Sequence, residues 1–119
     1  MNIKVQRVYN INTPLKNAIL IDRLWPRGIS KATLNGVPWV RELAPSNELR
    51  RWFHEDKDAR WTAFNRKYQA ELKQNKKLII DIVSKYKKEI TLLTATREID
   101  TIPQSAQLAT MFIKPQNLE

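Results

Sequence analysis

Two short apolar segments, Ala18–Ile21 and Glu89–Thr94, constrain the fold more than any other feature of the sequence. Ala18–Ile21 is a continuous apolar run that ends at Asp22, which is typical of a strand buried on both faces. Glu89–Thr94 is predicted to be another strand. Antiparallel strands can be joined by a tight turn, whereas parallel strands need a long crossover. The long, mainly helical stretch between the two segments therefore favours parallel pairing in one sheet, with a right-handed connection.

The crossover carries clear helix signals. Ser46 is a good N-cap, and Glu48 places a negative charge in the first turn, where it suits the helix dipole. We expect Asp58 to cap a second helix. Apolar residues recur along the crossover at three- and four-residue steps, as they do on amphipathic helices. They are Leu49, Trp52 and Phe53, then Trp61, Phe64, Tyr68 and Leu72, then Leu78, Ile79, Ile82, Val83 and Tyr86.

The remaining segments complete an α/β pattern. Asn2–Tyr9 alternates apolar and polar residues and is predicted to be a strand, Trp39–Leu43 is predicted to be one helical turn, and Pro103 lies near the start of a last helix. A domain usually has ~100–200 residues, so we expect residues 1–119 to form a single domain. The predicted fold is α/β, with a three- to four-stranded, mostly parallel sheet covered by helices.

The segment Arg23–Pro38 shows no regular element and is punctuated by proline and glycine. Loops of this length are usually functional or disordered. This one carries apolar residues, so we expect it to pack against the domain. Trp25 has two interpretations, as a plug beneath the loop or as a platform on which a base stacks.

Residue composition excludes several classes of site. The chain has no cysteine, one histidine and two glycines, Gly28 and Gly36. Disulfides, iron–sulfur clusters and a multi-histidine zinc site within one chain are therefore excluded, as are the GxGxxG and GxxxxGK phosphate loops. We predict no metal and no cofactor. No apolar run approaches the ~18 residues of a membrane span, so we expect no membrane partner and a cytoplasmic protein.

Charge points to an anionic partner. The net charge is +9, and residues 1–41 hold seven bases and one acid, which gives this third of the chain +6. Arginine makes bidentate contacts with carboxylate or phosphate that lysine cannot make. An anionic ligand is one interpretation, and a charge that merely keeps a small protein soluble is the other.

Polar and charged residues follow both predicted parallel strands. Ligands bind beyond the carboxyl ends of the strands in open parallel sheets. Parallel pairing would bring one carboxylate, two threonines and three arginines to that edge and create an anion pocket, formed by Asp22, Arg23, Arg27, Thr94, Thr96 and Arg97. Alternatively, Asp22 and Arg23 form a structural ion pair or cap the turn.

Arg50 and His54 are four residues apart and share one face of the helix that follows Ser46. We expect Arg50 to join the anion-binding residues. His54 is a candidate general base or proton donor, with an ordinary exposed histidine as the alternative. The sequence Glu55-Asp56-Lys57-Asp58 is interpreted as a solvated turn rather than a metal site.

Two runs of sequence resemble a known family. They are Ile21-Asp22-Arg23-Leu24-Trp25-Pro26-Arg27-Gly28 and Glu42-Leu43-Ala44-Pro45-Ser46-Asn47-Glu48-Leu49-Arg50-Arg51-Trp52-Phe53-His54, flanked by matches at Lys4–Tyr9, Tyr68–Leu72 and Ile90–Leu93. Over residues 2–113 the chain resembles the YeaO-like branch of the bacterial family called "domain of unknown function 488". The resemblance implies a cytoplasmic α/β protein and no particular activity.

The chain departs from this family near its C-terminus. Relatives typically follow the third strand with a small residue, a lysine and an Asn-His or Cys-His pair. Here Arg97 replaces the lysine, and Ser105 stands at the histidine position. This departure weakens a catalytic interpretation for this chain.

Three functions follow as hypotheses. The first is binding of a phosphate-bearing or other anionic small ligand by Arg23, Arg27, Arg50, Thr94 and Arg97. The second is an enzyme acting on a nucleotide-like substrate, with Asp22 or His54 as general base. The third is a nucleic-acid-binding protein, which would bind with a steep dependence on salt.

Overall fold

The computed structural model describes residues 2–95 and confirms the predicted α/β class. Its strands are β1 (Asn2–Arg7), β2 (Ala18–Leu20) and β3 (Glu89–Thr94), its α-helices are α1 (Asn47–Glu55), α2 (Lys57–Gln74) and α3 (Lys76–Val83), and its short 3-10 helices are η1 (Val8–Asn10) and η2 (Arg41–Leu43). The sheet has the order β1-β3-β2, and both pairings are parallel. The helical crossover between β2 and β3 therefore joins two parallel strands, as predicted.

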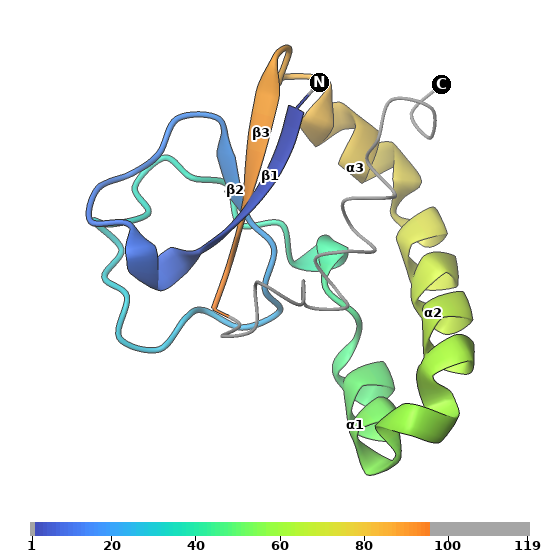
Figure 1. Ribbon diagram of the computed structural model, residues 1–119. Helices are drawn as coiled ribbons and strands as arrows, with labels where there is room; N and C mark the ends of the chain where they lie inside the picture. Colours follow the sequence, from blue (N-terminus) through green and yellow to red (C-terminus); the bar gives the residue numbers. More distant parts are fainter. Residues whose placement is uncertain (1, 96–119) are drawn as a thin grey trace.

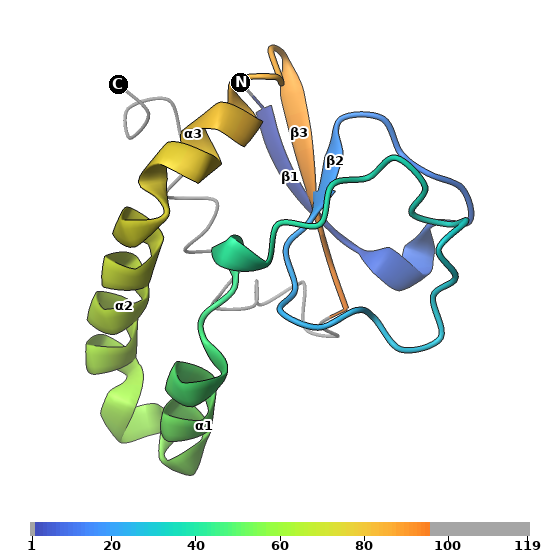
Figure 2. The ribbon, with the colours of Figure 1, turned by 180° about the vertical axis from the view of Figure 1, so that it is seen from behind.

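The sheet lies between a helical layer and a layer of loops. Figures 1 and 2 show α1, α2 and α3 on one side of the strands, and the long connections around β2 on the other side. Among residues 2–95, helices thus cover one face of the sheet and irregular chain covers the other. The last helix predicted near Pro103 lies outside the described residues.

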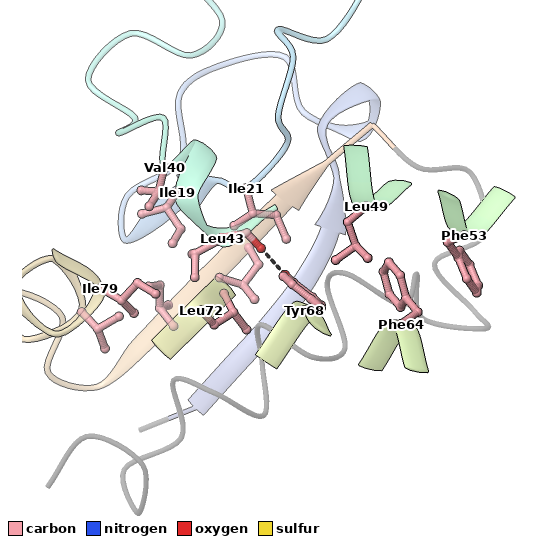
Figure 3. Packing of buried hydrophobic residues seen from close by; sticks show 13 residues of the cluster. Ile19, Ile21, Val40, Leu43, Leu49, Phe53, Phe64, Tyr68, Leu72 and Ile79 are labelled. Atoms are coloured by element: carbon pink, nitrogen blue, oxygen red, sulfur yellow. Dashed lines mark hydrogen bonds between the residues drawn. The ribbon is translucent and has the colours of Figure 1, made fainter. Parts of the chain in front are cut away.

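Alternate residues of the strands pack into two separate cores. Ile19 and Leu92 face the helices, where they join the buried side chains Phe64, Tyr68 and Leu72 of α2 (Figure 3). This confirms most of the predicted α2 face. Trp61 was expected in the same core but stays 37% exposed, with its ring stacked on Phe64 at the edge of the cluster.

The second core lies between the sheet and the loop layer. Leu20 and Leu93 pack there with Leu34, which the long loop contributes, and all three are buried. Trp25 is half-buried in the same cluster, meets Trp39 edge to face at 5.5 Å, and donates its indole N–H to the Ile29 carbonyl at 2.8 Å. The loop is therefore packed as predicted, and Trp25 acts as its plug.

The connector Leu43–Ser46 links η2 to α1 and is held by side chains of α2. The Tyr68 hydroxyl donates to the Leu43 carbonyl (Figure 3). Glu71 accepts from the Ser46 backbone N–H at 2.9 Å and from its hydroxyl at 2.7 Å. The Ser46 hydroxyl oxygen also accepts the Leu49 N–H, which confirms Ser46 as the N-cap of α1. The start of α1 is thus fixed to the C-terminal half of α2.

Some predicted boundaries are wrong. β1 ends at Arg7 rather than Tyr9, because Val8 turns into η1 to reach the core, where it is fully buried. The cap of α2 is Asp56, not Asp58: α1 ends one residue earlier, and the Asp56 carboxylate accepts the Ala59 N–H at 3.3 Å. Asp58 lies inside the first turn of α2.

We predict that Tyr68→Phe lowers the free energy of unfolding by about 1–3 kcal/mol, because it removes the hydroxyl that satisfies the Leu43 carbonyl in the core. Urea denaturation measures the change. The control is Tyr9→Phe, which removes an exposed hydroxyl bound to the Arg27 carbonyl and should cost less than about 0.5 kcal/mol. Equal losses in the two variants would contradict the role given to Tyr68.

Candidate functional site

Asp22 joins the carboxyl ends of β2 and β3. Its Oδ1 accepts the Thr94 hydroxyl at 2.7 Å, and its Oδ2 accepts the Ala95 backbone N–H at 2.7 Å. Its backbone carbonyl accepts the Trp39 indole N–H at 2.7 Å. Parallel pairing brings these residues together, as the sequence predicted for Asp22 and Thr94. The Thr94 side chain is buried and directed at Asp22 rather than at solvent.

Burial raises the pKa of the Asp22 carboxyl above its ordinary value of 3.8. The hydrogen bonds from Thr94 and Ala95 and the positive charge of Arg50 act in the opposite direction, but more weakly. The positive charge of Arg50 on α1 thus acts on the Asp22 carboxyl.

Arg23 fastens the connector from the side of the sheet. Its Nη2 donates to the Ala44 carbonyl at 2.7 Å, and its Nε donates to the Pro45 carbonyl at 3.4 Å. The predicted structural ion pair with Asp22 does not form, because the Asp22 oxygens accept from Thr94 and Ala95 instead. Two of the five guanidinium N–H groups are used in this way.

Arg50 and His54 are exposed on α1. Partial burial lowers the pKa of His54 below its ordinary value, and the positive charges of Lys57 and Arg50 lower it further. Two nearby cations thus disfavour the protonated form of His54. A base in this setting has no described carboxylate to orient it, because the ion pairs within 4.0 Å among residues 2–95 are Lys4–Glu89 and Arg60–Glu55.

Of the remaining predicted site residues, the structure describes only Arg27. Arg27 is exposed on the long loop, and the loop is held there by the Tyr9 hydroxyl, which donates to the Arg27 carbonyl at 2.9 Å. Thr96 and Arg97 lie outside the described residues. The structure thus joins Asp22 and Thr94 at one edge, and Arg50 acts on Asp22 through its charge.

Comparisons with known proteins identify the family. Residues 2–114 match the family model described as "DUF488-N3i: Inactive DUF488-N3 subclade". The chain belongs to the DUF488 family. It is 39% identical over 104 residues to "Uncharacterized protein YeaO" of Escherichia coli (strain K12), a match that covers 82% of this chain and 85% of the relative. It is 35% identical over 98 residues to "Uncharacterized protein Rv3073c" of Mycobacterium tuberculosis (strain ATCC 25618 / H37Rv), which covers 82% of both chains. No solved structure matches this DUF488 chain.

The two DUF488 motifs meet in the structure. Asp22 and Arg23 come from the first motif, and the connector and α1 come from the second. Arg23 binds the carbonyls of Ala44 and Pro45, so one motif holds the other in place. The YeaO-like resemblance is confirmed by the comparisons. The DUF488 positions of Arg97 and Ser105 lie outside the described residues.

One cation at the same edge was missed by sequence reasoning. Arg7 ends β1 in register with Thr94, and its guanidinium lies 5.2 Å from the centre of the Tyr9 ring. Its position as the last residue of a predicted parallel strand was the available signal, but the prediction extended that strand to Tyr9. Arg7 also interacts with other groups, so its charge is not free.

A hollow of about 290 Å³ lies away from this edge, between α1 and α2, and was not expected from the sequence. It is lined by Ser46, Glu48, Leu49, Trp52, Lys67 and Glu71. The Trp52 ring is covered by the Arg60 guanidinium at 4.7 Å and the Lys67 ammonium at 5.1 Å from its centre. The Trp52 ring, which is the aromatic surface of this hollow, is therefore already in contact with two cations.

Residues 2–95 contain no cluster of three or more histidine, cysteine, aspartate or glutamate side chains suited to a metal ion. In the same part of the chain, no helix combines the length and the apolar character needed to cross a membrane.

We predict that Arg23→Gln lowers the free energy of unfolding by about 1–3 kcal/mol, because the carbonyls of Ala44 and Pro45 lose their donors. Arg27→Gln is the matched control, since it removes the same charge from an exposed side chain of the same loop, and should change stability by less than about 0.5 kcal/mol. Urea denaturation of the two variants checks the difference, and an unaffected Arg23 variant would show that the connector is held without it.

The raised pKa of Asp22 predicts a pH dependence of stability. The folded protein binds a proton at Asp22 more readily than the unfolded chain does. The contribution of Asp22 to folding stability is therefore fully present below its ordinary pKa of 3.8, and it is lost as the pH rises through the pKa of the folded state. We expect the wild-type protein to lose stability relative to Asp22→Asn between about pH 4 and about pH 7. Urea midpoints at both pH values check this. A relative gain over the same interval would mean that the hydrogen bonds from Thr94 and Ala95 outweigh desolvation.

Proposed function

We propose that this DUF488 protein binds a phosphate-bearing or other small anionic ligand at the edge of the sheet where β2 and β3 end. Arg23 and Arg50 are the central binding residues. Asp22 and Thr94 support the site by fixing the strand ends, because each is engaged with the other. Arg27 and Arg97, from the segments that follow β2 and β3, would add further positive charge around the same ligand.

The observation that carries the proposal is the unmatched charge at this edge. Neither Arg23 nor Arg50 has a described carboxylate within 4.0 Å, even though Asp22 is their neighbour. The two Asp22 oxygens already accept from Thr94 and Ala95. Arg23 is half-buried and is held by two carbonyls, which leaves three of its N–H groups for another acceptor. A guanidinium held in one orientation suits the oxygens of a phosphate or carboxylate.

The family description supports binding rather than turnover. The matching model is named for an inactive subclade, and the catalytic hypothesis would need Asp22 or His54 as general base. Asp22 is occupied by two donors, and His54 lies beside Lys57 and Arg50 with no described carboxylate to orient it. An effector-binding or carrier role, in the cytoplasm, fits these observations best.

The test compares neighbouring arginines on α1. Arg50 and Arg51 are both exposed and carry the same charge, but only Arg50 acts on the Asp22 carboxyl. We expect inorganic phosphate or pyrophosphate to bind the wild-type protein in a calorimetric titration. Arg50→Gln should weaken that binding by about tenfold or more, since a hydrogen bond to a charged group contributes ~1.5–3 kcal/mol. Arg51→Gln should change it by less than about twofold.

Two results would overturn the proposal. One is a wild-type protein that binds neither phosphate nor pyrophosphate at millimolar concentration. The other is equal weakening by Arg50→Gln and Arg51→Gln, which would mean that only the overall charge matters. Urea denaturation of each variant establishes that the loss of binding is not a loss of folding.

A further inference from the structure

The densest positive charge of the chain lies in residues 66–88, far in sequence from the arginines of the strand edge. This segment holds eight bases and two acids, a net charge of +6 within the second half of α2, all of α3 and the turn before β3. The bases are Arg66, Lys67, Lys73, Lys76, Lys77, Lys85, Lys87 and Lys88. We call these eight residues the basic ridge.

The structure leaves this charge facing solvent. All eight side chains of the basic ridge are exposed, and none forms an ion pair within 4.0 Å with a described residue. Of the two acids in the segment, Glu71 is turned toward the connector, where both its oxygens accept from Ser46. Asp81 alone remains to offset the basic ridge from within the segment. Lys67 also contacts the Trp52 ring.

The basic ridge follows an extended element. Only Asn75 separates α2 from α3, and Figures 1 and 2 show the two helices as one curved column along the outer side of the molecule. At 1.5 Å per residue, helices of 18 and 8 residues extend over about 39 Å. Arg66 and Lys73 are seven residues apart and therefore share one face of α2. The charge is thus spread along a line rather than gathered into a pocket.

Helix stability does not account for the lysines at the start of α3. Lys76 and Lys77 stand in its first turn, which contains no acidic residue. A positive charge at a helix N-terminus is electrostatically unfavourable. The charges of these two lysines therefore destabilise α3. Burial of the apolar side chains Ile79 and Val83 in the core holds the helix in place.

We propose that the basic ridge binds the sugar–phosphate backbone of a nucleic acid. Seven of its eight bases are lysines, whose compact charges suit contacts with single phosphates and read no base sequence. From Arg66 to the end of α3 at Val83 it extends over about 27 Å at 1.5 Å per residue, a length that spans several successive phosphates of a B-DNA strand, which lie ~3.4 Å apart. An anionic membrane surface would call for an exposed apolar helix face beside the lysines, but Ile79 and Val83 of α3 are each 1% exposed, and Leu78, at 41%, is the one large apolar side chain of this helix that is exposed.

The test removes three charges from the basic ridge and three from elsewhere. The ridge variant is Lys73→Gln/Lys76→Gln/Lys77→Gln. The matched control is Lys16→Gln/Lys31→Gln/Arg51→Gln, three exposed bases outside the basic ridge. Fluorescence anisotropy with a labelled DNA duplex of about 20 base pairs, and with RNA of the same sequence, measures binding between about 50 and 200 mM salt.

We expect the wild-type protein to bind with an affinity that falls steeply with salt. Each phosphate contact contributes ~0.9 to the slope of log K against log salt, so the ridge variant should lose about 2–3 from this slope and bind about tenfold or more weakly in low salt. The control should lose less than about 1. Arg50→Gln should bind nucleic acid as the wild type does, which separates the basic ridge from the proposed small-anion site.

Three outcomes would overturn the proposal. They are no binding of either nucleic acid in low salt, equal loss in the ridge variant and the control, and binding to anionic phospholipid vesicles with none to nucleic acid. Because both triple variants lie on exposed side chains, urea denaturation should give wild-type midpoints, and the ridge variant should be no less stable than the control.

Discussion

The connector Leu43–Ser46 is the point on which the arrangement of the described chain depends. The Tyr68 hydroxyl, the Arg23 guanidinium and the Glu71 carboxylate all bind its backbone, and they come from α2 and from the segment that follows β2. Buried backbone groups need such partners, because an unsatisfied carbonyl or N–H in the core is costly. By holding this segment, the three side chains fix where α1 starts and which way it presents Arg50.

The same requirement explains the residues at the strand edge. The backbone N–H of Ala95 and the hydroxyl of Thr94 need acceptors where β3 leaves the sheet, and the Asp22 carboxylate supplies one oxygen to each. Both oxygens of Asp22 are therefore engaged in hydrogen bonds within the fold. This edge is where we propose that an anionic ligand binds, because Arg23 and Arg50 have no described carboxylate within 4.0 Å.

The family motifs serve the fold first. Arg23 and Ser46, which belong to different motifs, both act on the connector, and Trp25 closes the second core beneath the loop. A motif that joins distant parts of a fold can be specific to a family without being catalytic. The proposed small-anion site uses Arg50 and the N–H groups of Arg23 that these contacts leave over, and the proposed nucleic-acid surface is the basic ridge, whose side chains are exposed.

The presence of the strands, most of the helix faces and the parallel sheet could be predicted from the sequence, because these depend on the local periodicity of apolar residues and on the length of the crossover. The sequence also indicated that Asp22 and Thr94 would meet, since the ends of parallel strands lie at one edge. It could not determine what each polar side chain would bind. Arg23 binds the carbonyls of Ala44 and Pro45 with two of its N–H groups, a contact that joins residues more than twenty positions apart in the chain. Which charged side chains are bound within the fold, and which stay exposed, could be seen only in the folded structure. Hydrogen bonds between distant segments depend on how those segments pack and not on the local sequence pattern.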